Sequence, residues 1–221
     1  LIEPWDLREK VRETETGSLI IFVVDASGSM GAQRRMVAVK GAILSLLLDA
    51  YQRRDRVAMI AFRGTGAQVL LPPTGSVDLA QICLQEMPTG GRTPMSQGLL
   101  KALELVEVET IKDRGVLPLL VLLSDGRANV SLDGNSQGWT SAGQKLSAVG
   151  EVSAVADLVR QERIPSVVID TESGFFRLGL ARSVADALGA NYLQLEDLRP
   201  DNLAQAVRQE LPGSSEPVAS P

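Results

Sequence analysis

Five oxygen-bearing side chains in three short motifs are the residues of this sequence best suited to binding a metal ion. Asp25, Ser27 and Ser29 alternate in one motif, Thr93 precedes a proline in the second, and Asp125 precedes a glycine in the third. Mg²⁺ prefers oxygen ligands, usually one or two carboxylates with neutral oxygens and water. We therefore predict that these five residues bind one divalent cation, most simply Mg²⁺, with an exchangeable position open to a partner's carboxylate.

Each motif taken alone has an ordinary structural interpretation. Asp25, Ser27 and Ser29 are typical residues at the start of a helix that follows a strand. Thr93 could cap a helix whose first position is Pro94, and Asp125 could belong to a turn. The occurrence of all three motifs in one chain favours the metal site over these alternatives.

Other residues beside the motifs are candidates for contact with a partner protein. Arg92, Arg127 and Asn129 flank two of the predicted ligands, although a solvated loop would also explain them. Trp139 lies in a long connection, residues 129–147, and long connections in compact domains are often functional or disordered. An exposed tryptophan there would be a suitable interaction anchor, and flexible surface is the alternative.

Composition excludes several classes of function. The 221 residues include no histidine and one cysteine, which removes Ser-His-Asp and Cys-His catalysis, intrachain disulfides and the usual zinc sites. The net charge of −5 comes with scattered basic residues, so we expect no nucleic-acid binding. No apolar run approaches the roughly 20 residues of a transmembrane helix, and we expect no transmembrane segment.

The apolar runs between the motifs predict buried strands, because they are nearly continuous instead of alternating. Strands are expected at residues 19–24, 57–62, 117–123 and 166–169, with a weaker one at 191–195 and a possible edge strand at 69–71. Amphipathic stretches predict helices at residues 36–50, 95–106, 149–160, 178–188 and 202–211.

This alternation predicts an α/β fold with a doubly wound, mostly parallel sheet and helices on both faces. Ligands of such sheets bind outside the carboxyl ends of the strands, where all three motifs are expected to lie. We predict a polar lead-in segment at residues 1–18, one α/β domain at 19–210, and a flexible tail at 211–221.

In this order and after these elements, the three motifs resemble the metal-ion-dependent adhesion site of the von Willebrand A (integrin I-type) family. The resemblance covers roughly residues 19–210 in pattern. It implies a Rossmann-like fold and a protein-interaction function. It also implies that Asp25, Ser27 and Ser29 form the first part of the site, Thr93 the second and Asp125 the third.

Longer stretches are similar to the D subunit family of magnesium chelatase, including Asp6-Leu-Arg-Glu-Lys-Val-Arg12 and Pro88-Thr-Gly-Gly-Arg-Thr-Pro94. That D subunit couples the ATP-hydrolysing AAA+ I subunit to the porphyrin-binding H subunit for Mg insertion into protoporphyrin IX in chlorophyll biosynthesis. The resemblance implies these two partners and the cytoplasm of a photosynthetic bacterium or the chloroplast stroma. This chain contains no Gly-x₄-Gly-Lys-Ser/Thr loop. We therefore expect ATP to bind only outside this chain, which should be non-catalytic alone.

Three alternatives stay open. A cobalt-chelatase subunit would share the same architecture. A Mg-dependent aspartyl-phosphate hydrolase would use Asp25 as its nucleophile, although Ser27 stands where such enzymes usually carry a second acidic residue. The domain could also deliver the substrate Mg²⁺ to the porphyrin.

Overall fold

The computed structural model describes residues 17–28, 32–132, 137–139, 145–172, 178–195 and 209. Its main sheet has six strands in the order β3-β2-β1-β4-β7-β8. These are β1 (Ser18–Asp25), β2 (Arg56–Arg63), β3 (Gly66–Thr74), β4 (Leu117–Ser124), β7 (Ser166–Asp170) and β8 (Asn191–Gln194). All neighbours are parallel except β2 and β3. A separate antiparallel pair is formed by β5 (Gln137–Trp139) and β6 (Lys145–Ser147).

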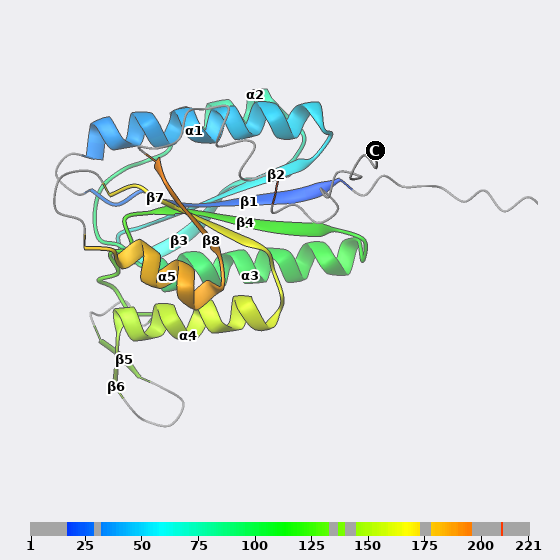
Figure 1. Ribbon diagram of the computed structural model, residues 1–221. Coiled ribbons are helices and arrows are strands. Elements are labelled where there is room, and N and C mark those ends of the chain that lie inside the picture. Colours follow the sequence, from blue (N-terminus) through cyan, green and yellow to red (C-terminus); the bar gives the residue numbers. More distant parts are fainter. Residues whose placement is uncertain are drawn as a thin grey trace, which may run out of the picture.

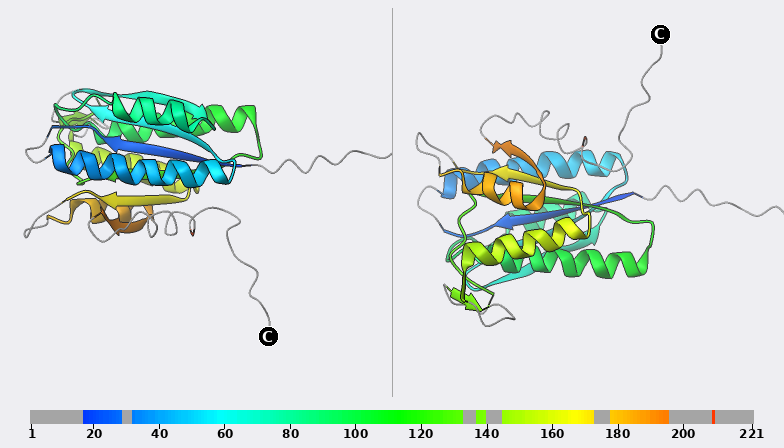
Figure 2. Two further views of the ribbon diagram at one scale, coloured as in Figure 1. Left: turned by 90° about the horizontal axis from the view of Figure 1, so that it is seen from above. Right: turned by 60° about the horizontal axis from the view of Figure 1, so that its bottom comes forward.

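Helices cover both faces of the main sheet (Figure 1). One face carries α1 (Ala32–Gln52) and α2 (Val77–Gln85), and the other carries α3 (Met95–Lys112), α4 (Ala148–Gln161) and α5 (Leu180–Leu188). Two further views show α1 lying along β1 on the first face, and α3 beside α4 on the second (Figure 2). None of the helices in the described part of the chain has the length and apolar character needed to cross a membrane.

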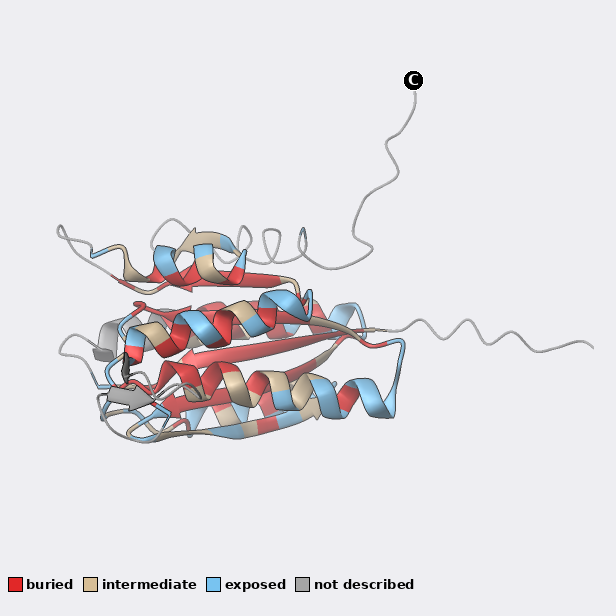
Figure 3. Cartoon of the chain, turned by 90° about the horizontal axis from the view of Figure 1, so that it is seen from below, coloured by how far each residue is buried: buried red, intermediate tan, exposed pale blue. Residues whose placement is uncertain are grey.

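The sheet separates two hydrophobic cores, and β1 contributes to both. Ile20, Phe22 and Val24 pack with α1 and α2, whereas the alternating residues Leu19, Ile21 and Val23 pack with α3, α4 and α5. Successive side chains of a strand point to opposite faces, so a strand covered on both sides must be apolar throughout. Figure 3 shows the result as buried strands between helices whose outer faces are exposed.

The predicted α/β fold is confirmed, and every predicted strand is present. The ends of five strands differ from the prediction by at most one residue. The exception is the edge strand. That strand is β3, which is longer than predicted and runs antiparallel to β2. It contains Pro72 and Pro73, and Gln68 and Val69 on it are exposed. Prolines are tolerated in a sheet mainly at its edge, because they cannot donate a backbone hydrogen bond.

Four of the predicted helices are present as α1, α3, α4 and α5, and α1 and α3 are longer than predicted. The short helix α2 was not predicted. The predicted helix at 202–211 lies outside the described residues except for residue 209. Ser18 is the first residue of β1, and the predicted division into residues 1–18, 19–210 and 211–221 stays a prediction.

Two helix glycines test how closely α3 approaches the sheet. A Cβ atom at Gly98 of α3 would lie 2.6 Å from Phe62 Cδ1, whereas a Cβ at Gly41 of α1 would meet nothing within 4 Å. We expect Gly98→Ala to lower the free energy of unfolding by ~1–2 kcal/mol, because overpacking outweighs the gain in helix propensity. Gly41→Ala should raise it by ~0.5–1 kcal/mol. Urea denaturation measures both, and equal stabilisation by the two variants would contradict this packing.

Candidate functional site

The strand register brings polar residues to one edge of the sheet. In β1 and β4, Val24 pairs with Leu123, and in β4 and β7, Ser124 pairs with Asp170. Asp25, Ser124 and Asp170 are therefore the last residues of three neighbouring strands and share the carboxyl edge of the sheet. This is the edge where ligands of doubly wound sheets bind.

The carboxylate of Asp25 is held from two sides. Its Oδ1 accepts a hydrogen bond from the Ser27 backbone N–H at 2.9 Å, and its Oδ2 accepts one from the Ser124 hydroxyl at 2.8 Å. Part of residue Asp25 reaches solvent, but protein atoms surround the carboxyl group. This burial raises the pKa of Asp25, the hydrogen bonds from Ser27 and Ser124 oppose the rise, and the nearby Asp125 charge adds to it.

Glycines join the loop after β1 to the loop before α3. The N–H of Gly90 donates to the Ala26 carbonyl at 2.8 Å, and the N–H of Gly28 donates to the Gly91 carbonyl at 3.2 Å. Gly90 and Gly91 have φ values of 118° and 95°, and a Cβ atom on Gly28 would lie 2.8 Å from Gly90 Cα. Only glycines allow the two backbones to approach this closely in these conformations.

The loop before α3 is joined in turn to the loop after β4. Asn129 Oδ1 accepts from the Thr93 N–H at 2.8 Å, and the Asn129 N–H donates to the Thr93 carbonyl at 3.2 Å. Thr93 is only 4% exposed. With the bond from Ser124 to Asp25, the three loops form a closed set of hydrogen bonds, so none of them can shift independently.

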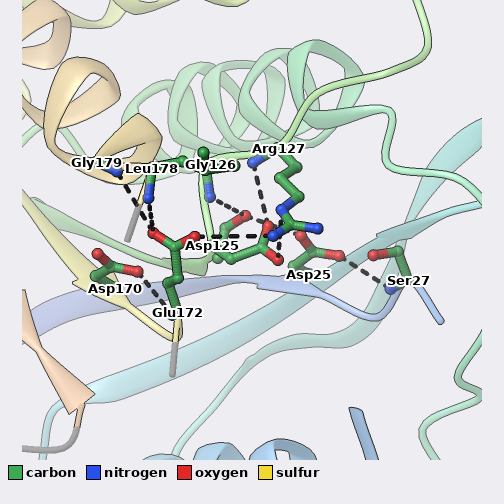
Figure 4. Close-up of polar contacts among 10 residues, drawn as sticks. Asp25, Ser27, Asp125, Gly126, Arg127, Asp170, Glu172, Leu178 and Gly179 are labelled. Atoms are coloured by element: carbon green, nitrogen blue, oxygen red, sulfur yellow. Dashed lines mark hydrogen bonds and ion pairs between the residues drawn. The ribbon is translucent and has the colours of Figure 1, made fainter. Parts of the chain in front are cut away.

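Asp125 and Arg127 occupy the third loop. Asp125 is buried, and its Oδ1 accepts from the Arg127 N–H at 3.1 Å. The Arg127 guanidinium lies 3.6 Å from Asp125 Oδ2 and 3.7 Å from Glu172 Oε1, and Figure 4 shows it between these two carboxylates. Because Arg127 is half exposed and both distances are long, each ion pair contributes at most about 1 kcal/mol.

A second acidic group, which sequence reasoning missed, lies beside the site. Asp170 Oδ1 accepts from the Glu172 N–H at 2.7 Å, and Asp170 Oδ2 accepts from the Tyr192 hydroxyl. Glu172 Oε2 accepts from the N–H groups of Leu178 and Gly179 just before α5 (Figure 4). The available signal was that Asp170 directly follows a buried apolar run, as Asp25 does.

The predicted ligands Asp25, Ser27, Thr93 and Asp125 all lie on these three joined loops, while Ser29 lies outside the described residues. Within the described part of the chain, no group of three or more His, Cys, Asp or Glu side chains could hold a metal. A cation here would therefore depend on two carboxylates and on hydroxyl groups. Such an oxygen set suits Mg²⁺ better than softer metals.

The four residues predicted to contact a partner differ in their surroundings. Arg92 is exposed and its carbonyl accepts from the Gly64 N–H, whereas the Asn129 side chain is engaged by Thr93. Trp139 belongs to β5, which is the next element after the loop that carries Asp125 and Asn129. The partner-contact role of these residues and of Arg127 stays a prediction, although Asn129 has a visible structural task in positioning the loop that carries Thr93.

Comparison with known proteins gives a family match and relatives. Residues 20–127 match the von Willebrand factor type A domain. The chain is 47% identical to an uncharacterized protein of Mycobacterium tuberculosis and 38% identical to the magnesium-chelatase 67 kDa subunit of Chlorobaculum parvum. These matches cover 94% and 91% of this chain, but only 31% and 32% of the two relatives, so the chain spans about a third of their length.

An uncharacterized protein of Methanocaldococcus jannaschii is 37% identical over 79% of this chain and 94% of its own length. Among solved structures, a von Willebrand factor type A protein from Catenulispora acidiphila superposes with a TM-score of 0.56 at 18% identity. That superposition covers 88% of this chain and 42% of the other. At this identity the structural likeness concerns the fold alone.

The pKa of Asp25 leads to a prediction about stability. Since burial raises the folded-state pKa above the ordinary 3.8, ionised Asp25 lowers the stability of the metal-free protein above that pKa. We expect Asp25→Asn to unfold at higher urea concentration than the wild type near pH ~7 in a chelator. The difference should shrink as the pH falls and vanish below the ordinary pKa. A variant less stable than the wild type at neutral pH would contradict this.

Proposed function

Because the chain belongs to the von Willebrand factor type A domain family, we propose that it is a protein-interaction domain whose binding surface is built around a divalent cation. The ligands are Asp25, Ser27, Ser29, Thr93 and Asp125, and the cation is Mg²⁺. The observation that carries the proposal is the closed set of hydrogen bonds among the three loops that bear these residues.

Electrostatics supports a cation at this position. Asp25 is surrounded by protein and lies close enough to Asp125 for the two charges to disfavour each other. A divalent cation between the carboxylates would offset both the desolvation of Asp25 and this repulsion. Ser27 and Thr93 add neutral oxygens, which leave the bound ion with residual positive charge.

That residual charge gives the domain a way to recognise a partner. A carboxylate on another protein can complete the coordination of the ion, since Mg²⁺ usually retains several exchangeable waters. Arg92 and Arg127 are exposed beside the site and would add attraction for an acidic partner surface. The metal serves in this proposal as a bridge between proteins, and we propose no chemical step at it.

The relatives suggest the assembly in which this contact operates. Since the chain is 38% identical to a magnesium-chelatase 67 kDa subunit over 91% of its length, we propose a role in a chelatase-type complex. The domain would connect an ATP-hydrolysing AAA+ I subunit with a porphyrin-binding H subunit during Mg insertion. ATP would bind to the AAA+ parts and not to this domain. A cobalt-chelatase complex is the nearest variant of the same proposal.

No observation favours the hydrolase alternative. Ser27 stands where aspartyl-phosphate enzymes usually carry a second acidic residue, and its N–H donates to Asp25 Oδ1. A generic aryl phosphate assay with Mg²⁺ distinguishes the two functions. Steady metal-dependent phosphate release, lost in Asp25→Asn, would favour the hydrolase over the interaction domain.

Calorimetric titration with Mg²⁺ tests the metal site. We expect the wild type to bind one ion with a dissociation constant in the rough range of micromolar to millimolar. Asp25→Ala should lose the binding heat, because the ion loses a carboxylate ligand. Asp157→Ala is a matched control, since Asp157 is half exposed on α4 and pairs only with Arg160 among the contacts described. Identical curves for Asp25→Ala and the wild type would end the proposal.

Co-purification tests the partner part of the proposal separately. The wild-type protein should retain the candidate I and H subunits in Mg²⁺, and should release at least one of them in a chelator. Asp125→Ala should behave in Mg²⁺ as the wild type does in chelator, because the cation that bridges the proteins is lost. Retention that is insensitive to both the chelator and the substitution would mean that the contact lies elsewhere on the domain.

A further inference from the structure

A groove of about 810 Å³ opens between α3 and α4 at the end of the sheet opposite the proposed metal site. Its floor and walls are mainly apolar. Its lining includes Leu100, Leu103, Val106 and Ile111 from α3, Leu158 from α4, and Leu117 and Pro118 from β4. Glu104, Glu107 and Glu162 also line it, together with Arg163. A mainly apolar groove of this kind suits a peptide segment that carries large apolar side chains.

Several of these residues are more exposed than their positions in the fold would suggest. Leu117 and Pro118 begin a strand that has neighbours on both sides and helices on both faces, yet they are only half-buried. Ile111 is 76% exposed and Leu158 is 46% exposed. Apolar surface gathered in this way on a domain marks a place where something else packs.

The chain itself enters the fold beside this groove. Ser18, the first residue of β1, pairs with Leu117, which lines the groove. The Ser18 N–H also donates to Asp55 Oδ1 at 2.8 Å, which fixes the point of entry. Residues 1–16 therefore join the domain at a point about one inter-strand spacing, roughly 5 Å, from Leu117 in the groove lining. Trp5 lies twelve positions before Gly17, a stretch that can span ~40 Å when extended and ~18 Å when helical.

Residues 1–16 include apolar side chains that suit the apolar lining of the groove. Trp5, Leu7 and Val11 are apolar. The charged residues of the segment are three basic ones (Arg8, Lys10 and Arg12) and five acidic ones (Glu3, Asp6, Glu9, Glu13 and Glu15), so its net charge is −2. The apolar residues can cover the exposed leucine and isoleucine side chains of the groove, so the proposed contact is apolar and not electrostatic. Tryptophan is a residue type that contributes strongly to such contacts, because it buries a large surface with few rotatable bonds.

We propose that residues 1–16 dock in the groove between α3 and α4, with Trp5 as the main apolar contact. The docked segment covers the exposed start of β4. The proposal is independent of the cation site, which lies at the other end of the strands.

Tryptophan fluorescence tests the docking directly, because the chain contains only Trp5 and Trp139. In a Trp139→Phe background, Trp5 is the sole reporter. We expect its emission to be blue-shifted and poorly quenched by acrylamide. Ile111→Glu or Leu158→Glu should shift the emission to longer wavelength and increase quenching. Val108→Glu is the matched control, since Val108 is 46% exposed on α3 but does not line the groove. It should leave Trp5 unchanged.

Hydrogen exchange provides a second readout that does not require a groove substitution. Trp5→Ser should speed exchange in residues 158–165 and leave α2, on the opposite face, unchanged. Asp25→Ala should leave Trp5 emission unchanged, so a failure of the metal proposal is distinguishable from a failure of this one.

The proposal would be overturned if Trp5 emission in the Trp139→Phe variant were typical of free tryptophan, or if both groove substitutions left it unaltered. A blue shift that disappears on dilution would assign the groove to a second copy of the chain and would also overturn it.

Discussion

The hydrogen bond from the Ser124 hydroxyl to the Asp25 carboxylate joins two strand ends that are 99 residues apart in sequence. It depends on β1 and β4 being adjacent and in register, and it fixes the side chain around which the proposed site is arranged. A hydrogen bond to a charged group contributes ~1.5–3 kcal/mol, which offsets part of the cost of surrounding Asp25 with protein. The glycine contacts and the pairing of Thr93 with Asn129 then hold the remaining loops against this fixed point.

Periodicity and motif order were sufficient to predict the fold, because a parallel sheet covered on both faces leaves continuous apolar runs such as β1. They were insufficient for β3, where exposed Gln68 and Val69 and two prolines hide the strand, and for α2, which has only nine residues. A strand at the sheet edge with an open face carries a weak hydrophobic signal, and so does a helix of two to three turns.

The site also contains residues that the sequence identified and residues that only the structure revealed. Asp25, Ser27, Thr93 and Asp125 were identifiable because their residue types and spacing match a chemistry, and metal binding by them stays a prediction. The engagement of Asn129 by Thr93 was invisible in the sequence, since it depends on two loops that meet only in three dimensions. Asp170 and Glu172 belong to no motif, yet they extend the acidic edge towards α5 and Tyr192. Their hydrogen bonds concern the architecture of the edge and are independent of any cation.

The two prolines of β3 have a consequence for how copies of this domain can pack together. A free sheet edge is a template on which another chain can add a strand and so begin aggregation. Pro72 and Pro73 carry no N–H to offer, and the pairing of β3 with β2 is irregular between Met59 and Ile60 and between Val57 and Met59. Strand addition on the part of β3 that contains these prolines is therefore disfavoured, which lowers the tendency of copies of the domain to join through this edge of the sheet.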